Sequence, residues 1–80
     1  MIYVSMYRLT QLQTIRKARG LSQAALAELA GVPKWTIQKH ERDVKTDAYL
    51  SVAHKLAVAL EVPIEALFLP EITSKVLKAA

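Results

Sequence analysis

The chain has 80 residues, which is enough for one compact domain and too few for two. It contains no cysteine, so neither disulfides nor a thiolate metal site can hold the fold together, and the apolar share of 52% must supply the core. The formal net charge of +4 favours a polyanionic partner, and every apolar run is far shorter than the roughly 20 residues that a membrane span requires. We therefore expect a cytoplasmic protein that does not enter membranes.

The first eight residues carry apolar side chains without a helical period. Ile2, Val4 and Met6 alternate as they would in a short strand, so segment 1–8 is ambiguous. We expect the folded domain over residues 9–69.

Two helices are predicted at the start of this domain. Apolar residues recur at helical spacing from Leu9, and Gly20 supplies the left-handed conformation that ends the first helix. Ser22 is a suitable N-cap for the alanine-rich segment QAALAELA, which forms the second helix and ends before Gly31.

Pro33 fits the first turn of a third helix, because its missing amide hydrogen costs nothing there, and this helix runs to Glu41. The charged stretch 42–47 is predicted to be a loop, with Asp47 as the N-cap of a fourth helix over 48–60. That helix is expected to bury one stripe made of Leu50, Ala53, Leu56, Ala57 and Leu60.

Pro63 opens a fifth short helix that continues through Phe68, and Pro70 stops it. Residues 70–80 form a tail or a further short helix and are a candidate dimer contact. Five helices without a clear strand predict an all-α fold, a compact bundle of five short helices.

The segment LSQAALAELAGVPKWTIQKHE has the features of two short helices that cross closely around a tight turn. Ala27 is small where the helices touch, and Gly31 tolerates the positive φ of the turn. Ile37, with Val32 leading in, gives the second helix an apolar face to bury.

These residues resemble the helix-turn-helix of the phage repressor and Cro family, the lambda-repressor-like XRE domains, over about residues 9–68. The match rests on Gly-Leu-Ser-Gln before the second helix, Ala27, Gly31-Val32, Thr36-Ile37, Glu41 and the closing Val-Pro-Ile-Glu-Ala-Leu-Phe. The resemblance implies a sequence-specific DNA-binding transcriptional regulator, a repressor, that binds a palindromic operator as a homodimer. The chain has no catalytic triad, phosphate loop or clustered acid and base residues, so we expect neither an enzyme nor a cofactor or metal.

The resemblance makes helix 33–41 the recognition helix, whose outward side chains face base edges in the major groove: Lys34, Trp35, Gln38 and Lys39. The residues implied as phosphate contacts are Gln23, Thr36, Arg42 and Lys45. An ion pair between Arg16 and Glu41 is implied to tie the first and third helices together. His40 is expected to be a half-buried packing residue, and His54 an exposed one.

Three alternatives stay open at this point. The lysines and glutamine of helix 33–41 could form a plain solvated face, and Trp35 could belong to the core if that helix were rotated by one position. The domain could also act mainly through protein contacts, as an antitoxin or an adaptor with an unknown protein partner. Asp43 and Glu61 stand where the family often has glycine, so each is expected to adopt a left-handed conformation.

Overall fold

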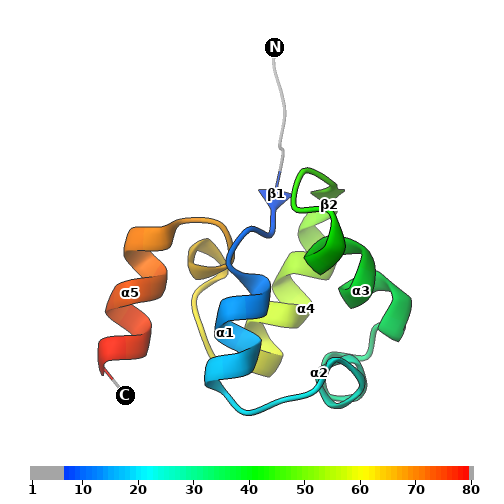
Figure 1. The fold of residues 1–80 in the computed structure, drawn as a ribbon, viewed down its shortest axis with the longest axis horizontal. Coiled ribbons are helices and arrows are strands. Elements are labelled where there is room, and N and C mark those ends of the chain that lie inside the picture. The colour runs from blue at the N-terminus through cyan, green and yellow to red at the C-terminus, as the bar shows by residue number, and fades with distance from the viewer. Residues whose placement is uncertain (1–6, 80) are drawn as a thin grey trace.

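The computed structural model describes residues 7–79, which fold mainly into helices joined by short turns (Figure 1). The helices of this part are α1 (Leu12–Ala18), α2 (Gln23–Ala30), α3 (Lys34–Arg42), α4 (Leu50–Leu60), the 3-10 helix η1 (Ile64–Leu67) and α5 (Pro70–Ala79). Two short strands, β1 (Tyr7–Arg8) and β2 (Asp47–Ala48), accompany them. The predicted all-α fold class is confirmed. Ile2, Val4 and Met6, whose alternation would suit a short strand, lie outside the described residues.

The turns around α2 form where the sequence supplies the required backbone chemistry. The Ser22 hydroxyl accepts a hydrogen bond of 3.0 Å from the Ala25 amide and so caps the start of α2. Gly20 and Gly31 have φ angles of 73° and 71°, as predicted, in the left-handed region that side chains with a Cβ rarely adopt. No atom lies within 4 Å of the place where their Cβ would stand, so backbone conformation and not space favours glycine there.

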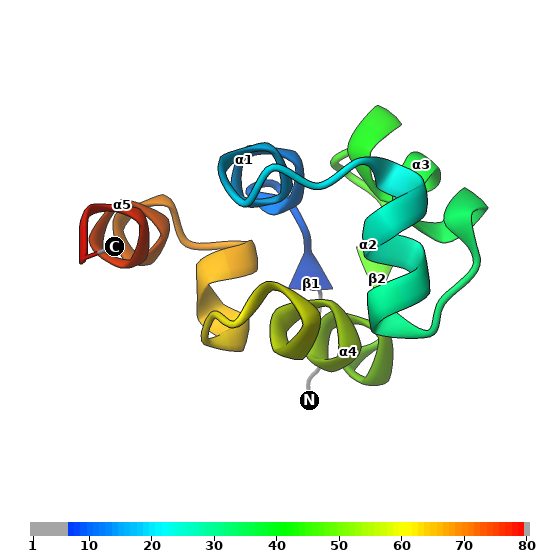
Figure 2. The ribbon, with the colours of Figure 1, turned by 90° about the horizontal axis from the view of Figure 1, so that it is seen from below.

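One apolar core holds the helices together. Its largest fully buried side chains are Leu9, Leu12, Ile15, Leu26, Ile37, Leu56, Leu60 and Leu67. Each such burial contributes about 1.5–3 kcal/mol, so the core is the main source of stability in a chain without cysteine. Seen from below, α1 and α4 lie on opposite sides of β1, and α5 and α3 stand at opposite ends of the molecule (Figure 2). Along the described chain, no helix combines the length and apolar character needed to cross a bilayer.

The two strands pair antiparallel and correct the predicted start of α4. Arg8 stands opposite Asp47, and its Nε lies 3.5 Å from the Asp47 carboxylate. This pairing holds Asp47 in a strand, so it is not the N-cap; that position belongs to Tyr49, and α4 begins at Leu50 instead of residue 48. Leu50 is therefore in the first turn and 52% exposed, and the expectation that it belongs to the buried stripe is wrong. The other four members of the stripe are buried as predicted.

Glu61 and Asp43, the two residues expected in a left-handed conformation, differ in their observed backbone angles. Glu61, at the end of α4, has φ 60° and ψ 46° and is left-handed as predicted. Asp43, at the end of α3, has φ −127° and ψ 93° and is extended, because the chain leaves α3 toward β2 instead of turning back on the helix. The prediction for Asp43 is wrong.

The C-terminal part contains two helical elements. The predicted fifth short helix is the 3-10 helix η1. Pro70 follows η1 and is also the first residue of α5. Thr73 joins the two elements, because its hydroxyl donates to the carbonyl oxygen of Ala66 at 2.6 Å and lies 3.1 Å from that of Leu69. Residues 70–79 are thus a helix anchored to the domain and not a tail.

Candidate nucleic-acid interface

The turn between α2 and α3 sets the angle at which α3 leaves the domain. The Ala27 carbonyl oxygen accepts hydrogen bonds from the amides of Gly31, at 2.9 Å, and Val32, at 3.1 Å, which closes the end of α2. Pro33 follows in an extended conformation and caps α3 without needing an amide hydrogen. Ala27 and Val32 are both buried at this junction, so the two helices approach closely, as their small and apolar residues predict.

The buried side of α3 fixes which residues face outward. Thr36, Ile37 and His40 are buried, with 7%, 0% and 3% of their surface exposed. The outward residues of α3 are Lys34, Trp35 and Gln38, which are exposed, and Lys39, which is partly exposed. Trp35 is 60% exposed, so the alternative that places it in the core is wrong. Four side chains that can contact another molecule therefore share one helix face with a fixed orientation.

A hydrogen-bonded cluster around Glu41 holds the end of α3 against the other two helices of the motif. Arg16 donates from Nε to Glu41 Oε2 at 2.6 Å and from Nη2 to Oε1 at 2.9 Å. Oε1 also accepts from Gln23 Nε2 at 3.0 Å and from Gln13 Nε2 at 3.4 Å. The third guanidinium nitrogen of Arg16 donates to the Leu21 carbonyl oxygen at 2.8 Å, in the turn between α1 and α2. The cluster thus joins α1, α2 and α3.

Burial and hydrogen bonding act on the cluster in opposite directions. The Arg16 and Glu41 side chains are only 10% and 3% exposed, so both charges are largely removed from water. Burial alone would raise the pKa of Glu41, but hydrogen bonds from Arg16 and the two glutamines, with the Arg16 charge, outweigh it and lower the pKa. The hydrogen bond to Glu41 likewise raises the pKa of Arg16 against the effect of burial. The pair stays ionised, which is what a structural tie requires.

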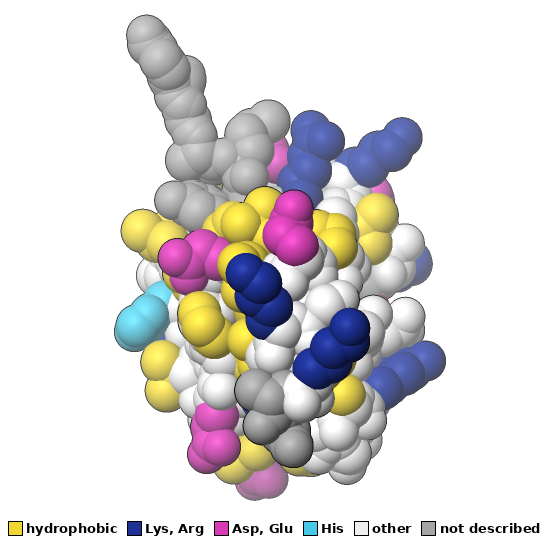
Figure 3. Space-filling view, turned by 90° about the vertical axis from the view of Figure 1, so that its left-hand side faces the viewer, with side chains coloured by type: hydrophobic (Ala, Val, Ile, Leu, Met, Phe, Trp, Pro, Cys, Tyr) yellow, Lys and Arg dark blue, Asp and Glu magenta, His cyan; other side chains and the backbone are white. Residues whose placement is uncertain are grey.

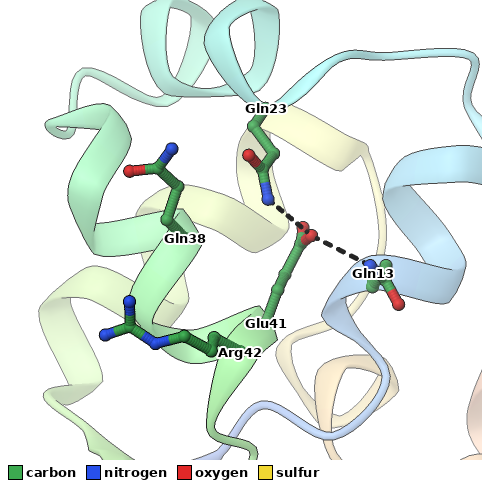
Figure 4. Close-up of a pocket in the computed structure, with 5 residues that line it drawn as sticks. All are labelled: Gln13, Gln23, Gln38, Glu41 and Arg42. Carbon is green, nitrogen blue, oxygen red and sulfur yellow. Dashed lines mark hydrogen bonds between the residues drawn. The ribbon is translucent and has the colours of Figure 1, made fainter.

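An open depression of about 400 Å³ lies beside this cluster (Figure 4). It is lined by Gln13, Gln23, Gln38, Glu41 and Arg42. The Gln38 and Arg42 side chains come from α3, and those of Gln23 and Gln13 reach the Glu41 carboxylate from the other helices (Figure 4). Because Arg16 compensates the Glu41 charge, the amide and guanidinium donors around the depression can serve an anionic group such as a phosphate.

A helix-turn-helix family model matches residues 12–67, which is more than half of the chain. The chain belongs to the XRE, lambda-repressor-like helix-turn-helix family. The resemblance seen in the sequence is thereby confirmed. Domains of this family are DNA-binding transcription regulators and are typically not enzymes. A search of curated proteins finds no significant match.

The phosphate-contact candidates of this helix-turn-helix domain differ in their placement. Arg42 is exposed and lines the depression, and Gln23 lines it while bonded to Glu41. Lys45 is exposed in the following loop, where its amide donates to Asp43 Oδ1 at 3.1 Å. Thr36 is buried, so little of its surface is available to a phosphate, and the geometry gives no support to that candidate.

Gln13 belongs to this site and was not among the residues predicted from the sequence. Its amide reaches the Glu41 carboxylate and it lines the depression. A signal was present, because Gln13 precedes Arg16 by three positions and therefore lies on the same face of α1. A polar residue one helical turn from an expected buried ion pair is a candidate hydrogen-bond partner for it.

His40 lies on the inner side of α3 and is buried, more deeply than the half-burial expected from the sequence. Its Nδ1 has no hydrogen-bond partner within the described part of the chain. Burial lowers the pKa of His40, the nearby Lys39 charge lowers it further, and a hydrogen bond with the Thr46 backbone opposes both effects. The imidazole is thus held in its neutral form beneath the outward face.

Proposed function

We propose that this chain is a transcriptional repressor that binds operator DNA as a homodimer and reads the major groove with α3. The observation that carries the proposal is the outward face of α3: two lysines, a glutamine and a 60% exposed tryptophan lie on a helix whose opposite side is buried in the core. An exposed tryptophan is costly to leave in water, so its position on this face favours a binding partner.

The chemistry of this face suits base edges. Lysine ammonium groups donate to O6 and N7 of guanine, and the Gln38 amide can pair bidentately with adenine. The Trp35 ring offers apolar contact for a thymine methyl group. These contacts would read the sequence, whereas Gln23, Arg42 and Lys45 would hold phosphates and set the register.

Repression needs nothing beyond occupancy of the operator. A domain bound in the major groove of a promoter excludes RNA polymerase from the same DNA, so binding alone would be sufficient to repress transcription. A two-fold dimer would present its two α3 helices about 34 Å apart, one helical turn, and would favour a palindromic site.

For the dimer contact we propose the segment 70–80. Hydrophobic side chains gather on the face at the α5 end of the molecule, with both basic and acidic side chains beside them (Figure 3). Ile72 and Val76 pack against the core, and Leu77 on the neighbouring side of α5 is partly exposed. A patch that carries both signs of charge can pair with itself across a two-fold axis, because each lysine then meets an acid of the second copy.

The test of the reading function is selection of bound sequences from random duplex DNA at moderate salt. We expect one enriched, palindromic sequence. Lys39→Ala should change the selected bases as well as the affinity, and Gln23→Ala should weaken binding to all sequences equally. If the wild-type chain enriched no sequence, or if both variants weakened all sequences alike, the proposal would be wrong.

Light scattering tests the dimer separately. Leu77→Glu should give a monomer, and Leu29→Glu, an exposed control on α2, should leave the dimer intact. The opposite result would place the contact away from α5.

A second candidate function is binding to another protein, as an antitoxin or adaptor. It is favoured by large apolar side chains that are exposed away from α3, such as Tyr49 at 82% and Val58 at 62%. A stable complex with the product of a neighbouring gene on size exclusion, combined with a lack of sequence preference on DNA, would favour this function over repression.

A further inference from the structure

Trp35 and Lys39 contact one another on the outward face of α3. The Nζ atom of Lys39 lies 5.2 Å from the centre of the Trp35 ring, within the range of a cation–π interaction. The two residues are four positions apart, so their side chains lie one above the other along the helix. Long helical side chains lean toward the helix N-terminus, which brings the ammonium of Lys39 back over the ring.

The ring holds the ammonium without using its hydrogen-bond donors. The ion pairs of the described residues are those of Arg8 with Asp47 and Arg16 with Glu41, so Lys39 has no carboxylate partner among them. A carboxylate would accept one or more of the three N–H groups, whereas the face of an indole attracts the charge and leaves them to a later acceptor. Lys39 is thereby placed and still able to donate.

We propose that Trp35 positions the Lys39 ammonium and that the two side chains read two adjacent base pairs as one unit, a guanine by Lys39 and a neighbouring thymine by the Trp35 ring. This inference rests on the proposed function of α3 in the major groove. Trp35 is thus a positioning residue for Lys39 as well as a contact of its own.

The geometry of the pair sets the length of DNA that it covers. Successive bases along one strand are about 3.4 Å apart. The separation of 5.2 Å between ammonium and ring centre is longer than one step and shorter than two. The ammonium reaches O6 and N7 of one guanine while the ring edge reaches the methyl group of the thymine beside it.

The neighbouring residues of α3 do not duplicate this arrangement. Lys34 and Gln38 share the outward face and are exposed, but the ring contact in the described part of the chain is that of Lys39. A lysine that is not held loses side-chain entropy when it is fixed on a base, and contact with the ring removes part of that loss in advance. Base preference at the guanine should therefore depend on both residues.

A double-mutant cycle on DNA tests the coupling. Affinity is measured for the wild-type chain, Trp35→Ala, Lys39→Ala and the double variant, each on the operator selected by the wild type and on the same duplex with the guanine changed to adenine. We expect Lys39→Ala to remove most of a roughly tenfold preference for guanine. Trp35→Ala should lower that preference by roughly two- to fivefold, and the double variant should show no further loss beyond Lys39→Ala.

Trp35→Phe is the matched control, because phenylalanine keeps an aromatic face at the same position. It should retain more of the guanine preference than Trp35→Ala, although tryptophan is the stronger partner. Thermal unfolding of all variants should change little, since both side chains lie outside the core. Salt dependence gives an independent readout: Trp35→Ala should leave the slope unchanged because it removes no charge.

The outcomes separate this inference from the function on which it rests. If the wild-type chain enriches no sequence, the proposed function fails. If it is selective but Lys39→Ala costs the same with and without Trp35, the residues act independently and the inference is overturned. If Lys39→Ala lowers the salt slope by about one and spares the guanine preference, Lys39 holds a phosphate and the inference is equally overturned.

Discussion

The outward face of α3 and the cluster beneath its last turn belong to the same short helix and obey different physical rules. On the face, Lys34, Trp35 and Gln38 are exposed, and Trp35 is not among the hydrophobic side chains that pack against the core. At the last turn, Glu41 accepts four hydrogen bonds from three side chains, two of them from Arg16, and only 3% of its side chain is exposed. A change on the face should alter what the helix binds, and a change in the cluster should alter whether the helix is held at all.

This contrast explains how one scaffold can serve different DNA sequences. The cluster joins α1, α2 and α3 through hydrogen bonds that involve none of Lys34, Trp35, Gln38 and Lys39. Substitutions on the face therefore carry little stability cost, because surface changes are usually within about 0.5 kcal/mol. Specificity can change while the support beneath it stays the same.

The strongest test of the contrast removes the charge that compensates Glu41. Arg16→Met keeps the apolar length of the side chain and leaves a buried carboxylate without its ion-pair partner. It should cost about 3 kcal/mol of unfolding free energy, measured by urea or thermal denaturation. The control is Arg8→Met, whose ion pair with Asp47 is about half exposed and should contribute little. Equal losses for the two variants would contradict the special role of the cluster.

The face is tested by Gln38→Ala. We expect a loss of roughly tenfold in preference for one adenine in the selected operator, because a bidentate amide contact contributes about 1–3 kcal/mol of discrimination. The melting temperature should hardly change, since Gln38 is exposed. A fall in stability without any change in base preference would show that the face and the cluster are not separate.

His40, on the buried side of α3, gives a pH test. Its pKa is lowered in the fold from an ordinary value of 6.5, so the unfolded chain binds a proton first as the pH falls. The contribution of His40 to the free energy of unfolding should be fully present above about pH 6.5. It should decline as the pH falls below this value, until the pKa of His40 in the folded state is reached. His40→Leu should abolish this slope, because leucine cannot take up a proton. A slope that persists in this variant would assign the titration to another group.

The smallest expected effect concerns phosphate contacts. Arg42→Ala should weaken binding to all sequences alike and lower the slope of log affinity against log salt by about one. Lys55→Ala, an exposed lysine of α4 that lies outside both the helix-turn-helix and segment 70–80, is the control and should leave the slope unchanged. Loss of preference at a single base in Arg42→Ala would move this residue from the phosphate group to the reading face.

Local signals in the sequence were sufficient wherever one residue decides the backbone. Ser22 caps α2 and Gly31 takes the left-handed turn as predicted, because both effects act within four residues. The helix pattern predicted that Ile37 is buried, the family resemblance implied that Trp35 faces outward, and both are confirmed. The orientation of α3 could therefore be predicted from the sequence.

Errors arose where distant segments meet. The pairing of Arg8 with Asp47 spans 39 positions and has no local signature, yet it delays the start of α4 and turns Leu50 to solvent. The same loop keeps Asp43 extended. The burial of Thr36 was not predicted for a related reason, since it depends on how α3 packs against the rest of the domain.

The short β1–β2 pair encloses the entire helix-turn-helix within one loop of the chain. Closing a loop of this length costs conformational entropy, and the hydrogen bonds of two-residue strands offset little of that cost. The pair should therefore form after the helices have packed. In native-state hydrogen exchange it should open first, at a free energy well below that of global unfolding, and release the segment that carries Lys45. The stretch that follows α3 would then fluctuate in solution while α3 itself keeps its place.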